Sequence, residues 1–98
     1  MEKLKGSVKK HLRSLAHHLK PVVMVGRNGV SEQLIASVDA ALKDHELIKV
    51  KFLDFKEEKK EIAQEIAVIT KSEVIGVIGN IVIFYRQHPQ AELRKIKF

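Results

Sequence analysis

Residues 26–29, Gly-Arg-Asn-Gly, are the part of the sequence best suited to bind a phosphate group. Their glycines let the backbone adopt a positive φ and let a ligand approach closely. Ser31 is a good N-cap, so the free N–H groups and positive dipole of a helix N-terminus would lie beside this loop. Arg27 adds a guanidinium that matches phosphate oxygens, and Asn28 can hydrogen-bond to a phosphate or a base edge. The alternative is an ordinary tight turn between a strand and a helix.

A second Gly-x-x-Gly, Gly-Val-Ile-Gly at 76–79, is not expected to bind phosphate. Its middle residues are apolar, and the match runs along a predicted strand into a turn. Gly76 instead predicts a β-bulge or a close approach of another part of the protein. The sequence contains neither a Gly-Lys-Ser/Thr phosphate loop nor a dinucleotide-binding fingerprint, so we expect no cofactor.

The overall charge favours an anionic partner, because the net charge is +6 and the pI is about 9.7. Nucleic acid is the leading candidate, an acidic membrane surface comes second, and a basic surface kept only for solubility is the third interpretation. Aromatic residues make up only 5%, so contacts to phosphates should dominate over base stacking. Phe84 and Tyr85 point to opposite faces of one strand and cannot form a paired stacking platform. Besides the loop residues Gly26, Arg27, Asn28 and Gly29, the predicted RNA contacts are Lys9, Arg13, Lys20, Lys49, Lys51 and Arg86.

Lys49, Lys51 and Arg86 are weaker candidates for RNA contacts than the other cations. Lys49 and Lys51 share one face of a predicted strand, where they could extend an RNA footprint or only be solvated. Arg86 follows the last strand, so it would lie at the opposite end of the sheet from the loop if that strand is antiparallel to the first.

The five histidines predict neither a metal site nor a catalytic centre. His11 and His18 could share a helix face, but they lack a nearby third ligand, and the absence of cysteine excludes a Cys-based zinc site. A ribonuclease could use a histidine pair with Lys20 or Asp39, but the spacing shows no convergence of acid and base groups. We therefore expect no enzyme, and a protein-binding adaptor that uses a sheet edge is a further alternative.

Hydrophobic periodicity predicts seven elements in the order α-β-α-β-α-β-β. Ser7 should cap the first helix and Pro21 should stop it. Gly79-Asn80 should form a two-residue hairpin turn between the last two strands. The expected helices span residues 7–19, 31–44 and 57–71, and the expected strands span 22–25, 47–53, 73–78 and 81–85.

Two consecutive β-α-β units imply parallel strands whose crossover helices lie on the same side of the sheet. The expected fold class is α/β, a two-layer sandwich with a four-stranded mixed sheet, helices on one face and a more open opposite face. One domain should cover residues 1–86, and the polar, basic segment 87–98 should be a loosely ordered tail. The longest apolar run, residues 81–85, is too short to span a bilayer, and no secretory signal is apparent, so we expect a cytoplasmic protein. We also expect a monomer.

Three segments in the right order resemble the bacterial YhbY family, the stand-alone CRM domain named for chloroplast RNA splicing and ribosome maturation. The resemblance covers about residues 4–86 and rests on LRSLAHHLKPVVMVGRNGVSEQL, ALKDHELIKVKF and VIGNIVIFYR. It implies a fold that resembles the C-terminal domain of translation initiation factor 3. It also implies that the last strand lies inside the sheet, between the second and the third.

The same resemblance implies RNA binding, association with precursors of the large ribosomal subunit, and no catalysis. The family's Gly-x-x-Gly loop corresponds to residues 26–29, where Arg27 stands in place of a frequent lysine and keeps the charge. Val30-Ser31 stands where the family often has Leu-Thr, and Ser31 can still cap the helix. Plant relatives with several CRM domains assist intron splicing, a role less expected for a chain with one domain and no transit peptide.

Overall fold

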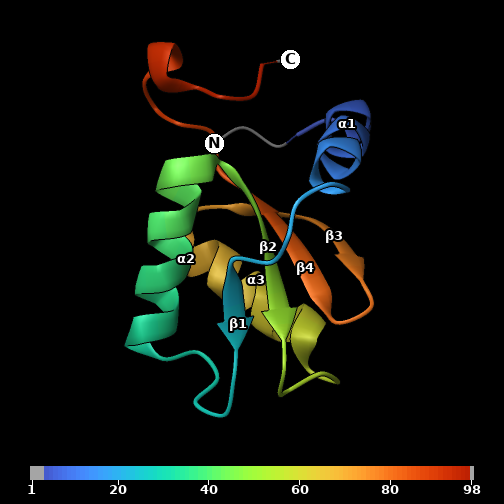
Figure 1. Ribbon diagram of the computed structural model, residues 1–98, viewed down its shortest axis with the longest axis vertical. Coiled ribbons are helices and arrows are strands. Elements are labelled where there is room, and N and C mark those ends of the chain that lie inside the picture. Colours follow the sequence, from blue (N-terminus) through green and yellow to red (C-terminus); the bar gives the residue numbers. More distant parts are fainter. Residues whose placement is uncertain (1–3, 98) are drawn as a thin grey trace.

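The computed structural model describes residues 4–97 and contains the seven expected elements in the expected order (Figure 1). A short 3₁₀ helix follows them in the C-terminal segment. The elements are α1 (Gly6–Ala16), β1 (Val23–Val25), α2 (Glu32–His45), β2 (Leu47–Phe52), α3 (Lys59–Thr70), β3 (Glu73–Ile78), β4 (Ile81–Tyr85) and η1 (Ala91–Leu93). No helix within the described residues is both long and apolar enough to cross a membrane.

The four strands form one mixed sheet in the order β1-β2-β4-β3. β1 and β2 are parallel, whereas β4 is antiparallel to both of its neighbours. The last strand therefore lies between the second and the third, which confirms the position implied by the family resemblance. The β3–β4 hairpin pairs Ile78 with Ile81 across Gly79-Asn80, and Gly79 has a φ of 58°, as the two-residue turn predicted.

The crossover helices α2 and α3 pack on one face of the sheet and form the larger hydrophobic core with it. Because successive side chains of a strand point to opposite faces, every second residue of β2 and β4 points into this core. Fully buried members from five elements are Val25, Val38, Val50, Ile66 and Phe84.

The first helix corrects the expectation that all helices lie on one face, because α1 packs on the opposite face. Its Leu12 and Ala16 join Leu47, Ile83 and Tyr85 in a second buried cluster. The physical reason lies in β4, whose unbroken apolar run from Ile81 to Tyr85 presents hydrophobic side chains to both faces and needs cover on each.

The first helix is also shorter than predicted. It ends at Ala16 rather than at residue 19, and Ser7 lies inside its first turn, while Lys5 occupies the N-cap position without a side-chain hydrogen bond. Leu15 and Leu19, which continue the apolar spacing of the buried Leu12 and Ala16, are 38% and 39% exposed. In α3, Ile69 differs in the same way, because it follows the fully buried Ile66 at helical spacing and is half exposed.

Gly76 marks both features that its position predicted. The β3–β4 register shifts between Val74 and Gly76, which is a β-bulge. A Cβ added at Gly76 would lie 3.0 Å from Cδ of Arg13, so the Arg13 side chain crosses the strand at close range. The Arg13 Nη1 then donates a hydrogen bond to the carbonyl of Ile75 at 3.0 Å, which fixes α1 to β3.

The C-terminal segment packs against the domain, which differs from the loosely ordered tail that the sequence predicted. Glu46 is buried between α2 and β2, and its carboxylate accepts backbone hydrogen bonds from three residues of the segment. The N–H groups of His88, Lys95 and Ile96 donate to it at 2.7, 2.5 and 3.0 Å. This buried acid is thus compensated by charge-assisted hydrogen bonds, which hold the C-terminal segment over the end of α2, while Ile96 packs against the second buried cluster.

Candidate nucleic-acid interface

The Gly26–Gly29 loop connects β1 to α2 at the lower end of the molecule in Figure 1, with exposed side chains at Arg27 and Asn28. The Gly29 N–H donates to the Gly26 carbonyl at 3.0 Å and closes a tight turn. Gly29 has a φ of 58°, which favours glycine. Gly26 is outside this φ region, and a Cβ there would meet nothing within 4 Å, so the fold does not require glycine at 26.

The loop leads into the N-terminus of α2, as the sequence predicted. The Ser31 hydroxyl accepts a hydrogen bond from the Leu34 N–H at 3.1 Å, which confirms Ser31 as the cap. A shallow cavity of about 340 Å³ lies beside the loop, between β1 and the first turns of α2. Its lining includes the hydroxyls of Ser31 and Ser37 and the amide of Gln33, and none of the described residues that line it is acidic. An anion could therefore approach this helix end from the cavity side, although Glu32 stands in the first turn of α2 outside the cavity lining.

Phe55 is a neighbour of the loop that sequence reasoning missed. The connection after β2 is held next to the loop because the N–H groups of Leu53 and Asp54 both donate to the Val25 carbonyl, at 2.9 and 3.2 Å. The exposed ring of Phe55 then lies against Gly29. The parallel pairing of β1 and β2, which places both strand ends at one edge, was the signal that could have revealed this contact. In contrast, Phe84 and Tyr85 are both fully buried.

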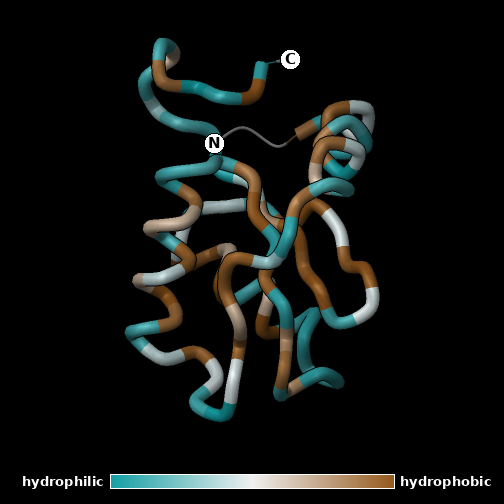
Figure 2. Tube along the Cα trace, viewed as in Figure 1, coloured by the Kyte–Doolittle hydropathy of each residue, from teal (hydrophilic) through white to brown (hydrophobic). Residues whose placement is uncertain are grey.

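Lys51 is the predicted cation that the sheet brings nearest to the loop. It pairs with Met24, two residues before Gly26, and both side chains are exposed on the part of the sheet that α1 leaves uncovered. Lys20 precedes β1 and is exposed at the other end of that strand. Figure 2 shows hydrophilic residues at the tip of the loop, below the hydrophobic strands.

Lys49 corrects both interpretations of this residue, because it is neither a surface cation nor a solvated one. Its side chain is only 9% exposed, and its Nζ donates to the carbonyls of Leu19 at 3.0 Å and His17 at 3.5 Å. These carbonyls follow the C-terminal end of α1, where a cation stabilises the helix dipole. Lys49 therefore attaches α1 to the sheet.

The remaining predicted cations lie away from the loop and have partners within the protein. Lys9 lies 3.8 Å from the carboxylate of Glu73, and Arg13 bonds to β3 as described above. Arg86 follows β4, which is antiparallel to β1 through β2, and so lies at the opposite sheet end, as expected. Its guanidinium donates to Asp39 Oδ1 at 2.6 Å and to the Thr70 carbonyl at 2.9 Å. The structure thus gathers Arg27, Asn28 and Lys51 at one end and leaves Lys9, Arg13 and Arg86 elsewhere.

Metal-ligating clusters are not found within residues 4–97, where no group of three or more histidine and acidic side chains converges. The rings of His17 and His18 lie edge to face, with centroids 5.3 Å apart. Among residues 4–97, the group whose pKa is strongly perturbed is the phenol of Tyr85, which lies in the second core rather than at the loop. Burial raises the pKa of Tyr85 to about 12, with a smaller contribution from Glu46 and an opposing one from Arg94.

The protein is thus a small α/β domain with a mixed sheet, in which a cationic loop bracketed by glycines precedes a capped helix. The chain belongs to the CRS1/YhbY (CRM) domain family, whose pattern matches residues 4–86. Among its relatives is a protein of Haemophilus influenzae named RNA-binding protein, 41% identical over 96% of each chain. A Pseudomonas aeruginosa relative named Probable RNA-binding protein is 39% identical over 84% of this chain and 80% of its own. The solution structure of a hypothetical Staphylococcus aureus protein superimposes with a TM-score of 0.80 at 35% identity, covering 97% of this chain and 100% of that one.

Proposed function

We propose that this protein binds RNA through the Gly26–Gly29 loop and the N-terminus of α2, without catalysing a reaction. The observation that carries the proposal is the loop itself. Two exposed polar side chains, Arg27 and Asn28, flank a cavity without acidic residues at a capped helix end. The names of the relatives and the net charge of +6 support the same partner.

In this mechanism the RNA backbone, rather than the base sequence, supplies most of the affinity. One phosphate approaches Gly26, where the absence of a side chain leaves room, and accepts hydrogen bonds from backbone N–H groups at the helix end. Arg27 binds its oxygens through the guanidinium fork. Lys51 supplies a second charge on the adjacent sheet surface, and Lys20 a third along β1.

We further propose that the RNA is ribosomal RNA in precursors of the large subunit, and that the protein assists subunit assembly in the cytoplasm as a monomer. This part rests on the YhbY-type resemblance of the sequence and on the match of the CRM pattern to residues 4–86. Arg86 and Lys49 have no role in the proposed interface, because their charged groups are engaged within the protein.

The test is sedimentation of the tagged protein in a cell-lysate gradient, beside the double variant Arg27→Asp/Asn28→Asp. Wild type should travel with large-subunit or precursor particles, and the variant should remain at the top of the gradient. Because both residues lie on an exposed turn, the variant should stay folded. If the wild-type protein stayed at the top of the gradient in every salt condition, the proposed ribosome association would be wrong. Equal sedimentation of both proteins would keep ribosome association and remove the loop from the interface.

A further inference from the structure

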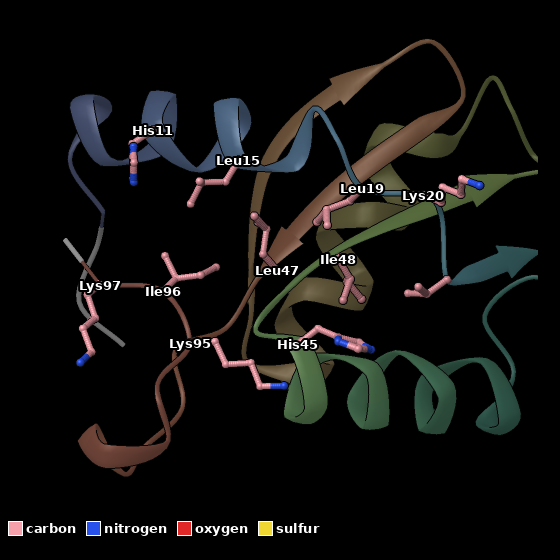
Figure 3. Close-up of a pocket in the computed structure, with 11 residues that line it drawn as sticks. His11, Leu15, Leu19, Lys20, His45, Leu47, Ile48, Lys95, Ile96 and Lys97 are labelled. Atoms are coloured by element: carbon pink, nitrogen blue, oxygen red, sulfur yellow. The ribbon is translucent and has the colours of Figure 1, made fainter.

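A second, larger cavity lies on the face of the sheet that carries α1 (Figure 3). Its volume is about 610 Å³, within the range of ligand-binding pockets. α1 and the start of β2 form two of its sides, and the end of α2 and the C-terminal segment form the others. The apolar side chains that line it are Leu15, Leu19, Val22, Leu47, Ile48 and Ile96.

The apolar lining includes two partly exposed leucines, Leu15 and Leu19. Leu15 lies in the last turn of α1 and Leu19 three residues beyond its end, and more than a third of each remains accessible. Isolated exposed leucines are ordinary, but here two of them face the same cavity together with Val22, which is half exposed. The cavity therefore offers aliphatic surface that a ligand could cover.

The polar groups around this cavity are all basic. They are His11, Lys20, His45, Lys95 and Lys97, and no described residue that lines the cavity is acidic. In Figure 3 Lys97 and Lys20 lie at opposite ends of the cavity, and Lys95 and His45 lie on its lower side, near the end of α2. An apolar surface with a cationic rim fits a ligand that combines a flat or apolar part with negative charge.

This cavity neighbours the proposed phosphate site, because Val22 lines both cavities. Val22 and Gly26 are four strand residues apart, which corresponds to about 13 Å. A few nucleotides of single-stranded RNA cover such a distance. Lys20 lies next to this path and could bind a phosphate on it.

We propose that the cavity between α1 and β2 binds an unpaired nucleotide base of the RNA strand whose phosphates are held at the Gly26–Gly29 loop. This inference rests on the proposed function. Leu15, Leu19 and Val22 cover the faces of the base, and the imidazoles of His11 and His45 reach its polar edge. Lys20, Lys95 and Lys97 bind the flanking phosphates. The loop then supplies charge-dependent affinity, and the cavity selects single-stranded over double-stranded RNA.

The test compares two fluorescein-labelled decamers of equal length and charge, a mixed-sequence single-stranded RNA and a chain of stable abasic spacers. Leu15→Asn/Leu19→Asn removes apolar surface from the cavity without changing the charge. It should weaken binding of the complete RNA by about tenfold and change binding of the abasic chain by less than about twofold. The matched control is Val68→Asn/Ile69→Asn, which makes the same exchange on the exposed side of α3, where Val68 is 77% exposed. This control should leave both affinities unchanged.

Three outcomes would overturn the inference. Equal weakening of both decamers would mean that the cavity does not recognise a base, and unchanged binding of both would mean that it does not touch RNA. If binding of both decamers is unchanged, a labelled peptide of alternating Leu and Glu is tested next. Binding of this peptide to wild type but not to Leu15→Asn/Leu19→Asn would assign the cavity to an acidic protein segment. Wild type that binds neither decamer would remove the proposed function as well. If the double variant unfolds, the single change Val22→Asn at a half-exposed position serves the same comparison.

Discussion

The ring of Phe55 lies so close to Gly29 that a Cβ at position 29 would be 3.3 Å from its Cε2 atom. Gly29 also has a φ of 58°, which L side chains rarely adopt. Two separate features therefore favour glycine here: the backbone conformation, and the Phe55 ring, which would have to shift slightly to admit a Cβ. The contact joins the connection after β2 to the candidate phosphate loop.

Gly29→Ala should consequently destabilise the protein by about 1–2 kcal/mol, because it adds backbone strain and forces the Phe55 ring to move. Denaturant unfolding monitored by circular dichroism measures this change. In the double variant Phe55→Ala/Gly29→Ala, the part of the destabilisation by Gly29→Ala that comes from the clash with the ring should disappear, and the part that comes from backbone strain should remain. An unchanged midpoint in Gly29→Ala would mean that the loop rearranges freely.

Gly26→Ala provides the opposite case within the same loop. A Cβ at 26 meets nothing within 4 Å and the φ is ordinary, so the free energy of unfolding should fall by less than about 0.5 kcal/mol or rise slightly. RNA affinity should nevertheless decrease several-fold, because a methyl group would stand where phosphate approaches the backbone. Fluorescence anisotropy with labelled RNA measures this. Unchanged affinity would show that no ligand passes close to Gly26.

Much of this arrangement follows from local sequence pattern. Three elements could be predicted because each depends on residues that are neighbours in the sequence. They are strand β2, from its alternating pattern, the hairpin at Gly79-Asn80, and the start of α2 at the Ser31 cap. The position of α1 could not be predicted from such patterns. Lys49 and Lys51 look alike in an alternating strand, and only the tertiary structure places one of them against the end of a helix.

Long-range contacts account for the other differences. The carboxylate of Glu46 holds backbone groups that lie 42 to 50 residues later in the sequence, and nothing in its local sequence indicates this. The Phe55–Gly29 contact depends on two connections that meet at one sheet edge. At the candidate site the loop was predictable from its glycines and charge, whereas its partners needed the fold.

The neighbouring lysines of β2 should therefore respond differently to the same substitution. Lys49→Met leaves the carbonyls of His17 and Leu19 without their donor, and should lower the free energy of unfolding by about 1–3 kcal/mol. Lys51→Met should change it by less than about 0.5 kcal/mol, because Lys51 is exposed. RNA affinity should show the reverse order under conditions where both variants are folded. If Lys49→Met weakened RNA binding more than Lys51→Met, the assignment of the two lysines would be wrong.

Salt should weaken RNA binding in a predictable way. With about three to five phosphate contacts, the logarithm of the association constant should fall against the logarithm of salt concentration with a slope of roughly −2 to −4. Arg27→Ala should reduce the magnitude of the slope by about one. Anisotropy titrations at several salt concentrations give both values, and a flat response would contradict a phosphate-based interface.

The buried phenol of Tyr85 should make the free energy of unfolding fall at alkaline pH. Burial is the main cause that raises the pKa of its phenol from 10.0 to about 12 in the folded protein. Above pH 10 the unfolded chain loses this proton while the folded protein keeps it, so stability falls as pH rises from 10 towards 12. The loss relative to Tyr85→Phe should approach about 1.4 kcal/mol per pH unit. Because Tyr85 is the only tyrosine in the sequence, phenolate absorbance reports its ionisation directly beside denaturant unfolding of both proteins. A stability difference that stays constant from pH 8 to 11 would mean that the phenol ionises equally in both states, which its burial against Leu12 and Ile83 in the second core makes unfavourable.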